Sequence, residues 1–554
     1  MDIIIFRNTN STNMKKIVLF LGSIVLLISC QKTKIQADLL VFNANVYTVD
    51  DSYPKAEAFV VKEGEFLAIG TNEELLHLYA ATDTLDAKGK TIVPGLIDAH
   101  CHFYRLGLQQ QKVDLTGTKS YDEVLKRLVV FQEEKNLSFI TGRGWDQNDW
   151  EVKEYPSKEI LDSLFPDTPV ALTRVDGHAM LVNQKVLDMA KITIDTKVMG
   201  GEILQKDGAL LGVLIDNPMG LVEAIIPEPS RDEQINALMD AEKINFGYGL
   251  TTIDDAGLSP KVIALIDSLQ KRNKLKIRMY AMVSNVPEYV DYYLQKGVYK
   301  TDKLNVSSFK VYADGALGSR GAVLKKPYSD QEDHFGAMVI GNEDFKELAK
   351  RLVLSDFQMN THAIGDSANA LVMKTYYDVL QGTSNRRWRV EHAQVVDSNE
   401  FELLDDNLIM SVQPTHATSD MYWADERLGL ERLKGAYAYK KLLEKTGRLA
   451  LGTDYPVEHV NPFYTFYAAV ARKDLKQYPK GGFQKENALT REETLKGMTL
   501  WAAYSNFEEL EKGSITRGKF ADFVILEEDI MKVDEDKIPT IKVNATYLGG
   551  EKVY

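Results

Sequence analysis

The sequence predicts an α/β fold in which eight parallel strands form a (β/α)8 barrel and the two ends of the chain form a small β domain. Two observations predict it. Apolar runs of strand length alternate with long amphipathic stretches, which is typical of repeated β/α units and a parallel sheet. Short β-branched runs separated by turn residues occupy both ends of the chain. With 554 residues, the chain is long enough for one such barrel with additional segments.

Eight apolar runs correspond to the barrel strands. The first, TIVPGLIDAH, ends in His100, and the last, LALGTD, ends in Asp454. Eight is the number of parallel strands in a TIM barrel. The six runs between them are GLTTID near Thr251, IRMYAMVS from Ile277, SSFKVYAD from Ser307, FQMNTHAIGD from Phe357, WRVEHAQ from Trp388 and IMSVQP from Ile409.

The lengths between these runs predict the organisation of the chain. Residues 95–485 are assigned to the barrel, and residues 103–249 to a large insertion after its first strand, because the interval is too long for one β/α connection. Residues 31–94 form the first part of the small β domain. Residues 486–554 contain the last helix and the second part of that domain.

Composition limits the class of partner. Apolar residues make up 44% and charged residues 26% of the chain, which are ordinary globular values. The formal net charge of -14 argues against nucleic acid or an anionic membrane surface as the main partner, since both attract basic patches. A small-molecule substrate is therefore expected, and the sequence leaves open whether the chain forms a homodimer.

Residues 1–30 are predicted to be a signal peptide. Lys15 and Lys16 precede an apolar run that is too short to span a bilayer, and LISC, ending at Cys30, resembles the lipobox of bacterial lipoproteins. We therefore expect an exported protein, lipid-anchored at Cys30 to the bacterial cell envelope. An uncleaved signal anchor is the alternative. Cys101 is the second of two cysteines, so a lipidated Cys30 would leave no disulfide within the mature chain.

Histidines and an aspartate follow several of the predicted strands. His100 and His102 lie two residues apart at the end of the first strand, so they point to one side while Cys101 points to the other. Taken alone, such a pair can also be a chance pair on a solvated edge. The other candidates strengthen the interpretation, since polar residues at the carboxyl ends of barrel strands face the catalytic mouth and these types are metal ligands. They are Lys310, His362, His392 and Asp454.

Lys310 lies within a strand among apolar residues, where an unpaired ammonium is costly. Burial lowers the pKa of a lysine, and the neutral amine can add carbon dioxide to give a carbamate. A carbamate has two oxygens that can bridge two cations. The alternative is a lysine at the barrel rim whose ammonium reaches water.

Seven motifs in order resemble the amidohydrolase superfamily, in particular amidohydrolase family 3, the branch with N-substituted formamide deformylase and the YtcJ-like proteins. The resemblance implies a distorted TIM barrel with a β-sandwich built from both chain ends, and one or two divalent ions, with zinc the expected metal. By resemblance, His100, His102, Lys310 and Asp454 would hold one ion, and carbamylated Lys310, His362 and His392 a second. The motifs are LIDAHCHF, KVYADGALGSRG, NTHAIGD, RVEHAQ, SVQPTHATSDMYWADERLG, LALGTDYPVE and ALTREETLKGMTLWAAY.

Such a site predicts roles for residues around the mouth. Asp454 is placed to accept a proton from a metal-activated water and to pass it to a leaving nitrogen. His178, after the run PVALT, is expected to polarise the substrate carbonyl, with a core histidine as the alternative. Substrate contacts are expected from residues that could instead be packing, turn or surface positions: Trp145, Asp176, Arg320, which could pair with an acidic group, Gln413 and His416.

Together these features predict an exported, metal-dependent amidohydrolase. We expect it to hydrolyse a C–N bond of a small amide, N-formyl or cyclic amide compound through a metal-activated hydroxide. A deaminase or an esterase or lactonase could use the same site, because the fold and the ligands do not fix the bond that is cleaved. A barrel that retains metal and binds or regulates without turnover is the third possibility, although the presence of Asp454 argues against it.

Overall fold

The computed structural model describes residues 34–405 and 407–554. Cys30 and the predicted signal peptide lie outside these residues. Within the described ranges, no helix combines the length and the apolarity needed to cross a membrane.

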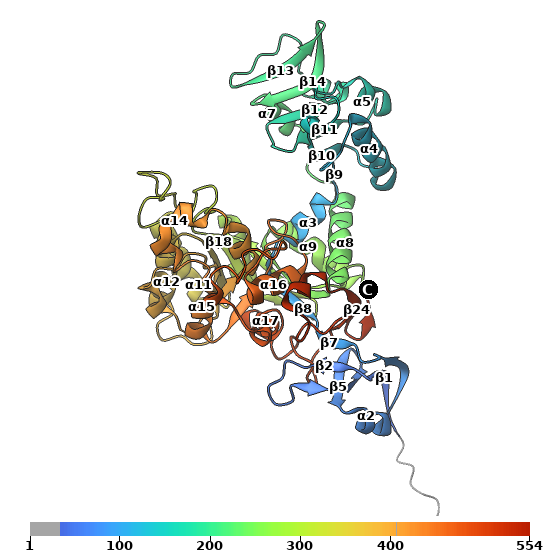
Figure 1. Cartoon of the computed structure of the whole chain (residues 1–554), viewed down its shortest axis with the longest axis vertical. Helices are drawn as coiled ribbons and strands as arrows, with labels where there is room; N and C mark the ends of the chain where they lie inside the picture. The colour runs from blue at the N-terminus through green and yellow to red at the C-terminus, as the bar shows by residue number, and fades with distance from the viewer. Residues whose placement is uncertain (1–33, 406) are drawn as a thin grey trace, which may run out of the picture.

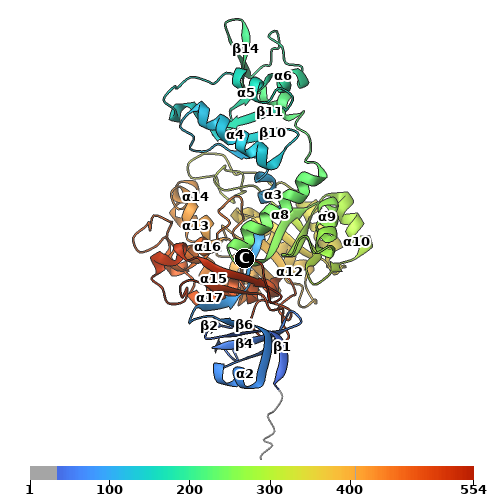
Figure 2. The ribbon, with the colours of Figure 1, turned by 90° about the vertical axis from the view of Figure 1, so that its right-hand side faces the viewer.

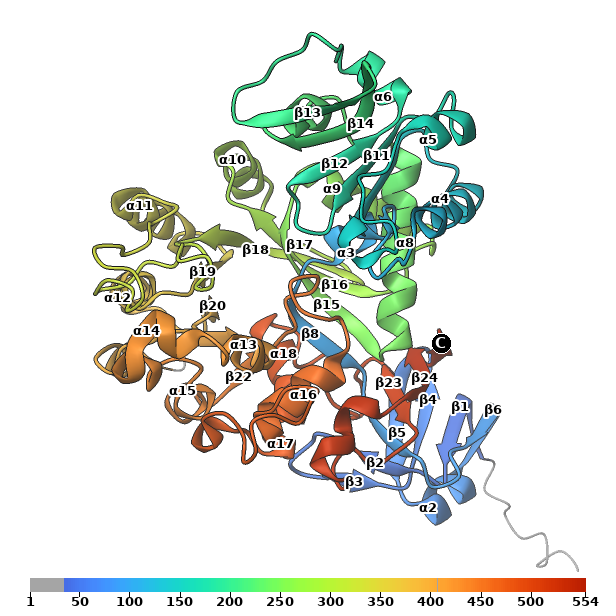
Figure 3. The same cartoon turned by 45° about the horizontal axis from the view of Figure 1, so that its top comes forward.

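Eight parallel strands form a nearly closed barrel, which confirms the predicted fold class. Each strand pairs with the next in chain order, and the first and last are joined by backbone hydrogen bonds from Asp454 to His100 and from His102 to Tyr455, each 2.8 Å long. Figure 3 shows helices outside these strands. The strands are β8 (Leu96–Cys101), β15 (Leu250–Leu258), β16 (Arg278–Ser284), β18 (Leu304–Tyr312), β19 (Gln358–Ala363), β20 (Trp388–His392), β21 (Leu408–Val412) and β22 (Leu449–Leu451).

Amphipathic helices cover the outside of the barrel. In α11 (Asn342–Val353), Phe345, Ala349 and Leu352 are buried, and the opposite face carries charged residues. Burial of such an apolar stripe stabilises the fold by about 25 cal/mol for each Å² of apolar surface removed from water, and it fixes the helix against the strands. The neighbouring helices are α9 (Pro260–Lys271), α10 (Pro287–Lys296), α12 (Asp366–Val379) and α15 (Tyr439–Thr446).

Both ends of the chain contribute strands to one six-stranded sheet below the barrel (Figure 1). Its central pair is β7 (Thr91–Pro94) and β23 (Phe523–Leu526), which run antiparallel. A four-stranded sheet packs on it, with the ring of Phe59 4.9 Å from that of Phe523. The two sheets have the orders β25-β24-β23-β7-β2-β3 and β5-β4-β1-β6; the remaining strands are β1 (Ile35–Phe42), β2 (Asn45–Tyr47), β3 (Lys55–Ala56), β4 (Ala58–Lys62), β5 (Glu65–Gly70), β6 (Tyr79–Asp86), β24 (Val543–Leu548) and β25 (Glu551–Lys552).

The segment between β8 and β15 contains a separate six-stranded sheet with its own core. Figures 1 and 2 show it standing above the barrel, joined through α3 (Phe103–Gln109) and α8 (Arg231–Gly247). Lys135, in α4 (Tyr121–Lys135), contacts Asp240 of α8 at 2.6 Å. The sheet order is β13-β14-β12-β11-β10-β9, with β9 (Val113–Asp114), β10 (Ile140–Trp145), β11 (Val170–Arg174), β12 (Ala179–Val182), β13 (Gly201–Lys206) and β14 (Ala209–Asp216).

Candidate metal centre

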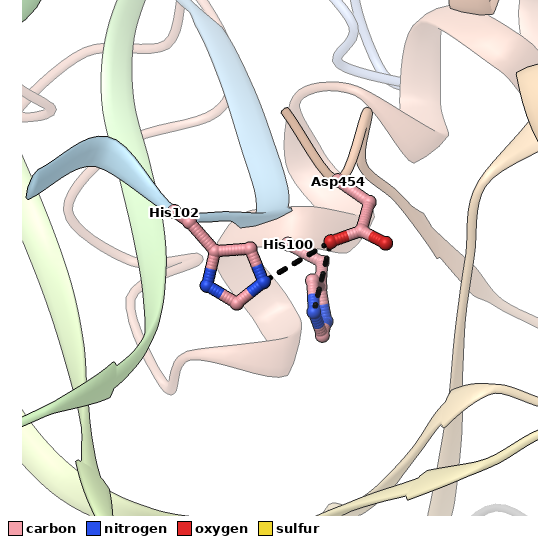
Figure 4. Close-up of side chains that lie close together, drawn as sticks. All are labelled: His100, His102 and Asp454. Carbon is pink, nitrogen blue, oxygen red and sulfur yellow. Dashed lines mark ion pairs between the residues drawn. The ribbon is translucent and has the colours of Figure 1, made fainter. Parts of the chain in front are cut away.

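The carboxyl ends of the barrel strands bring five of the nine histidines of the chain together around Asp454. Figure 4 shows Asp454 beside His100 and His102. Its Oδ1 atom lies 3.2 Å from Nε2 of His102 and 3.7 Å from Nε2 of His100. Cys101 points to the other side of the strand, as alternation predicts, and its thiol contacts the carbonyl of Asp254.

Lys310 belongs to the same group. Its Nζ atom lies 3.0 Å from Nε2 of His100, and the side chain is buried. Burial lowers the pKa of Lys310 from 10.5 to about 8, although Glu391 and Asp454 act in the opposite direction. A substantial fraction of neutral amine is therefore present at mildly alkaline pH.

Burial favours the neutral, metal-binding form of His100, His362 and His392. Burial, together with the charge of Lys310, lowers the pKa of His100 to about 4 and that of His362 to about 3. Burial also holds the pKa of His392 well below its usual range. The His392 ring lies 4.8 Å from that of His100 and 4.5 Å from that of His362. A neutral imidazole keeps one nitrogen lone pair for an ion.

Buried partners orient two of these rings. Nδ1 of His100 donates to Oε2 of Glu391 at 2.6 Å, and Oε1 of Glu391 pairs with Arg389 at 2.8 Å. Burial would raise the pKa of Glu391, but Arg389 and His100 outweigh it and lower this pKa to about 2. Because a carboxylate only accepts, the bond fixes the proton on Nδ1 and leaves Nε2 of His100 facing Asp454.

Gln413 has the same orienting function for His392. Its Oε1 atom lies 2.7 Å from Nδ1 of His392, and the side chain is buried, so it supports the ring; its predicted contact with a substrate stays a prediction. His392 itself has a φ of 72° and Asp454 a φ of 62°. Left-handed backbone is unfavourable for residues with a side chain, and it persists where the surroundings hold it, as at functional sites.

Asp98 helps to hold the backbone at Asp454 through the neighbouring residue Thr453. It accepts hydrogen bonds from the backbone N and the hydroxyl of Thr453, at 3.0 and 2.7 Å. These bonds tie β8 to the turn after β22. The residue that carries the central carboxylate is therefore anchored to the strand that carries His100 and His102.

The arrangement fits a divalent ion. The nitrogen and oxygen atoms of His100, His102 and Asp454 lie within 4.8 Å of one another, and a second such group consists of His392, His416 and Asp454. Two ligand atoms of a tetrahedral ion with bonds of about 2.0–2.2 Å lie about 3.3–3.6 Å apart, near the distances seen here. Oδ1 of Asp454 is buried without a hydrogen-bond donor among the described residues. An ion would satisfy it.

His362 points differently from the other predicted ligands. Its Nε2 atom lies 3.5 Å from the carbonyl of Gly315 and 3.7 Å from Asp314, and neither metal group in the described residues includes it. The ring still borders the site through His392.

Three predicted residues lie in the insertion. The ring of Trp145 is fully buried in its core, where Nε1 donates to the carbonyl of Leu172 at 2.8 Å, so it offers no wall to a substrate. The side chain of His178 is 75% exposed and bonds to Asp216 at 2.9 Å. Asp176 accepts from the backbone of His178. The described contacts do not join His178 or Asp176 to the barrel mouth, and their predicted roles stay predictions.

Arg320 is engaged within the protein. Its guanidinium pairs with both carboxylate oxygens of Asp330, at 3.1 and 2.8 Å. An acidic substrate group would have to displace this partner. A cavity of about 490 Å³ next to α3 carries other cations: Arg105, Lys112 and Arg143 line it with one acid, Asp114.

Sequence reasoning missed Glu391 and the supporting role of Asp98. A signal existed for the first, since Arg389 and Glu391 are two charged residues at alternate positions of a strand that is buried throughout. Such a pair, buried on one side of a strand, must meet partners across the barrel.

Known proteins resemble this chain over most of its length. The model of a family described as "Amidohydrolase family" matches residues 83–554. Protein LONG AFTER FAR-RED 3 of Arabidopsis thaliana is 34% identical (94% of this chain, 92% of the relative), and putative amidohydrolase YtcJ of Bacillus subtilis is 30% identical (92% and 98%). N-substituted formamide deformylase of Arthrobacter pascens is 24% identical (93% and 97%). The crystal structure of an uncharacterized metal-dependent hydrolase from Pyrococcus horikoshii superposes with a TM-score of 0.73 at 26% identity (90% and 99%). The predicted resemblance is confirmed.

Proposed function

Because the chain belongs to the amidohydrolase family, whose members are metal-dependent and act on C–N bonds, we propose that it hydrolyses a small N-formyl, N-acyl or cyclic amide outside peptide backbones. One observation carries the proposal: the buried carboxylate of Asp454 lies against the rings of His100 and His102 at the ends of the barrel strands. This combination of base and ligands at a barrel mouth suits hydrolysis.

The family resemblance indicates which residues would hold the ions. His100, His102, Lys310 and Asp454 would bind one, and carbamylated Lys310 with His362 and His392 a second; zinc suits these nitrogen and oxygen donors. A bound divalent ion supplies a Lewis acid that stabilises developing negative charge and lowers the pKa of water. For carbamylation, the neutral amine of Lys310 forms an N–C bond to carbon dioxide and loses a proton to solvent.

Asp454 performs the proton transfers. Its Oδ1 lies beside the rings of His100 and His102 and would hold the ion with them, so the second carboxylate oxygen, Oδ2, can accept the proton of the attacking water. The water oxygen adds to the amide carbon. As the C–N bond breaks, Asp454 returns the proton to the leaving nitrogen, which departs as a neutral amine. Each turnover thus leaves Asp454 ionised again.

The cavity beside α3 suggests where the remote part of a substrate lies. Arg105 lies three residues after His102, and Arg143 faces the same cavity from β10. We propose that these two arginines, instead of Arg320, bind an acidic group. Arg143→Ala should then raise KM for an N-acyl amino acid more than for the matching N-acyl amine, and equal changes would contradict this.

The proposed reaction is tested with the zinc-loaded full-length chain and a panel of N-formyl, N-acyl and cyclic amides, with esters, lactones and ring amines of matched size beside them. We expect release of amine and carboxylate from at least one amide. Turnover confined to esters or to ring deamination would replace the proposal with one of the alternative reactions. Binding without any turnover would indicate a non-catalytic barrel.

We also propose that the chain is exported and lipidated at Cys30, on the strength of the basic residues, apolar run and LISC sequence at the N-terminus. Cys30→Ser should release the protein from bacterial membranes in a fractionation experiment. Cys101→Ser, which changes the other cysteine, should leave it membrane-bound. Continued retention of the Cys30→Ser variant would instead support a signal anchor.

A further inference from the structure

We propose that Asp255 is a positioning residue for the metal centre: it holds the start of α3 and thereby the proposed ligand His102. This inference rests on the proposed metal-dependent function and deepens it. Asp255 lies in β15, the strand that pairs with β8, and its side chain is 2% exposed. None of the seven motifs of the family resemblance contains it.

The ring of His102 is supported differently from its neighbours. His100 and His392 each have a buried hydrogen-bond partner at Nδ1. Among the described residues, no hydrogen bond reaches Nδ1 of His102, while its Nε2 atom lies 3.2 Å from Oδ1 of Asp454. Ligand rings usually take their orientation from a partner at the second nitrogen. The position of the His102 ring therefore depends on how its backbone is held.

Asp255 provides a contact that this backbone needs. α3 begins directly after His102, and the first N–H groups of a helix have no partner within it. The side chain of His102, at the N-cap position, accepts none of them. Instead, Oδ2 of Asp255 accepts from the backbone N of Tyr104 at 2.9 Å. Burial raises the pKa of Asp255, and the N–H groups of Tyr104 and Phe103 oppose this shift, so both groups stabilise the charged carboxylate.

Two further contacts fix the same segment. The backbone N of His102 donates to the carbonyl of Tyr455 at 2.8 Å. At the other end of α3, Gly107 lies so close to α8 that a Cβ atom there would be 2.0 Å from the carbonyl oxygen of Ala237. Asp255 acts between these two contacts. Its loss would leave the first turn of α3, and with it the ring of His102, able to shift.

The test separates this contact from the charge of Asp255. Asp255→Ala removes the acceptor, whereas Asp255→Asn keeps an oxygen for the N–H of Tyr104 and removes the charge. Each full-length variant is stripped of metal and titrated with Co2+ against a competing chelator, and visible absorption reports the coordination. Asp255→Ala should bind the first ion about 10–100-fold more weakly, with an altered spectrum, as expected for loss of a residue that orients a ligand. Asp255→Asn should stay within about threefold of wild type, since Asn and Asp are comparable acceptors at helix starts.

Glu242→Ala is the matched control. Oε1 of Glu242 accepts from the backbone N of Ile277 at 2.8 Å, next to the start of β16 and so at the end of the barrel opposite the mouth. This variant should lose thermal stability as Asp255→Ala does, yet bind Co2+ like wild type.

Three results would decide against the account. Wild-type affinity in Asp255→Ala would overturn the positioning role. Equal losses in Asp255→Ala and Asp255→Asn would overturn it as well, because the charge and not the contact would then be required. No ion bound by the wild type would contradict the proposed function itself.

Discussion

The barrel mouth and the insertion both place histidines and acids after strands, yet among the described residues the groups that could hold a metal ion lie at the mouth. At the mouth, His100, His392 and Asp454 are buried, within reach of one another and held by further buried groups. In the insertion, His178 is exposed and pairs with Asp216. The difference teaches that a polar residue after a strand indicates chemistry only when the strand belongs to the sheet whose ends converge.

Replacing the central carboxylate should have the largest effect. Asp454→Asn removes the proton acceptor and one ligand charge at nearly constant shape, so we expect kcat/KM to fall by at least about 1000-fold. Asp195→Asn, the same change at an exposed position of the insertion, should change it less than about twofold. Substantial activity in the Asp454→Asn variant would end the claim that the mouth performs the proton transfers.

Replacing Lys310 should have the next largest effect. We expect Lys310→Ala to lower kcat/KM by about 100-fold or more, because the proposed carbamate bridge between the ions could not form. Added formate or acetate should restore part of the rate by supplying a carboxylate in the space left by the side chain. The measurement is turnover with and without the added anion. Undiminished activity without it would refute the carbamate.

The variant Glu391→Gln tests a residue that orients the proposed metal ligand His100 and does not itself react. The amide cannot hold His100 as an ionised carboxylate does, and outer partners of this kind usually contribute 10–100-fold to metal affinity, so a loss of about that size is expected. Titration with Zn2+ against a competing chelator measures it. If the affinity stays within about twofold, orientation by Glu391 is unimportant.

His178→Ala should have the smallest effect, a fall in kcat below about tenfold, since the described contacts keep this ring at the insertion surface. Steady-state kinetics on the best amide of the panel provides the value. A loss approaching that of Asp454→Asn would show that the insertion closes over the mouth and brings His178 to the substrate carbonyl, as the sequence predicts.

The strands and their polar ends could be predicted, whereas their cross-barrel partners could not. Periodicity locates β8 and β22 and hence His100 and Asp454, because strand ends in a barrel share one face. That Glu391 meets His100, or that His416 meets Asp454, depends on register and helix orientation, which no local pattern encodes. The sequence also cannot show that Trp145 lies in the core of the insertion, because a tryptophan that packs in a core and one that lines a pocket have the same sequence pattern.

The central claim is that chemistry at the barrel mouth requires a divalent metal. The most direct measurement is the rate of amine release from N-formyl and N-acyl amides by the full-length chain, first stripped of metal and then supplied with Zn2+ or Mn2+. We predict no turnover in the stripped protein and recovery as about two ions bind per chain. Equal rates in both states, or no amide hydrolysis after metal is restored and bound, would contradict it.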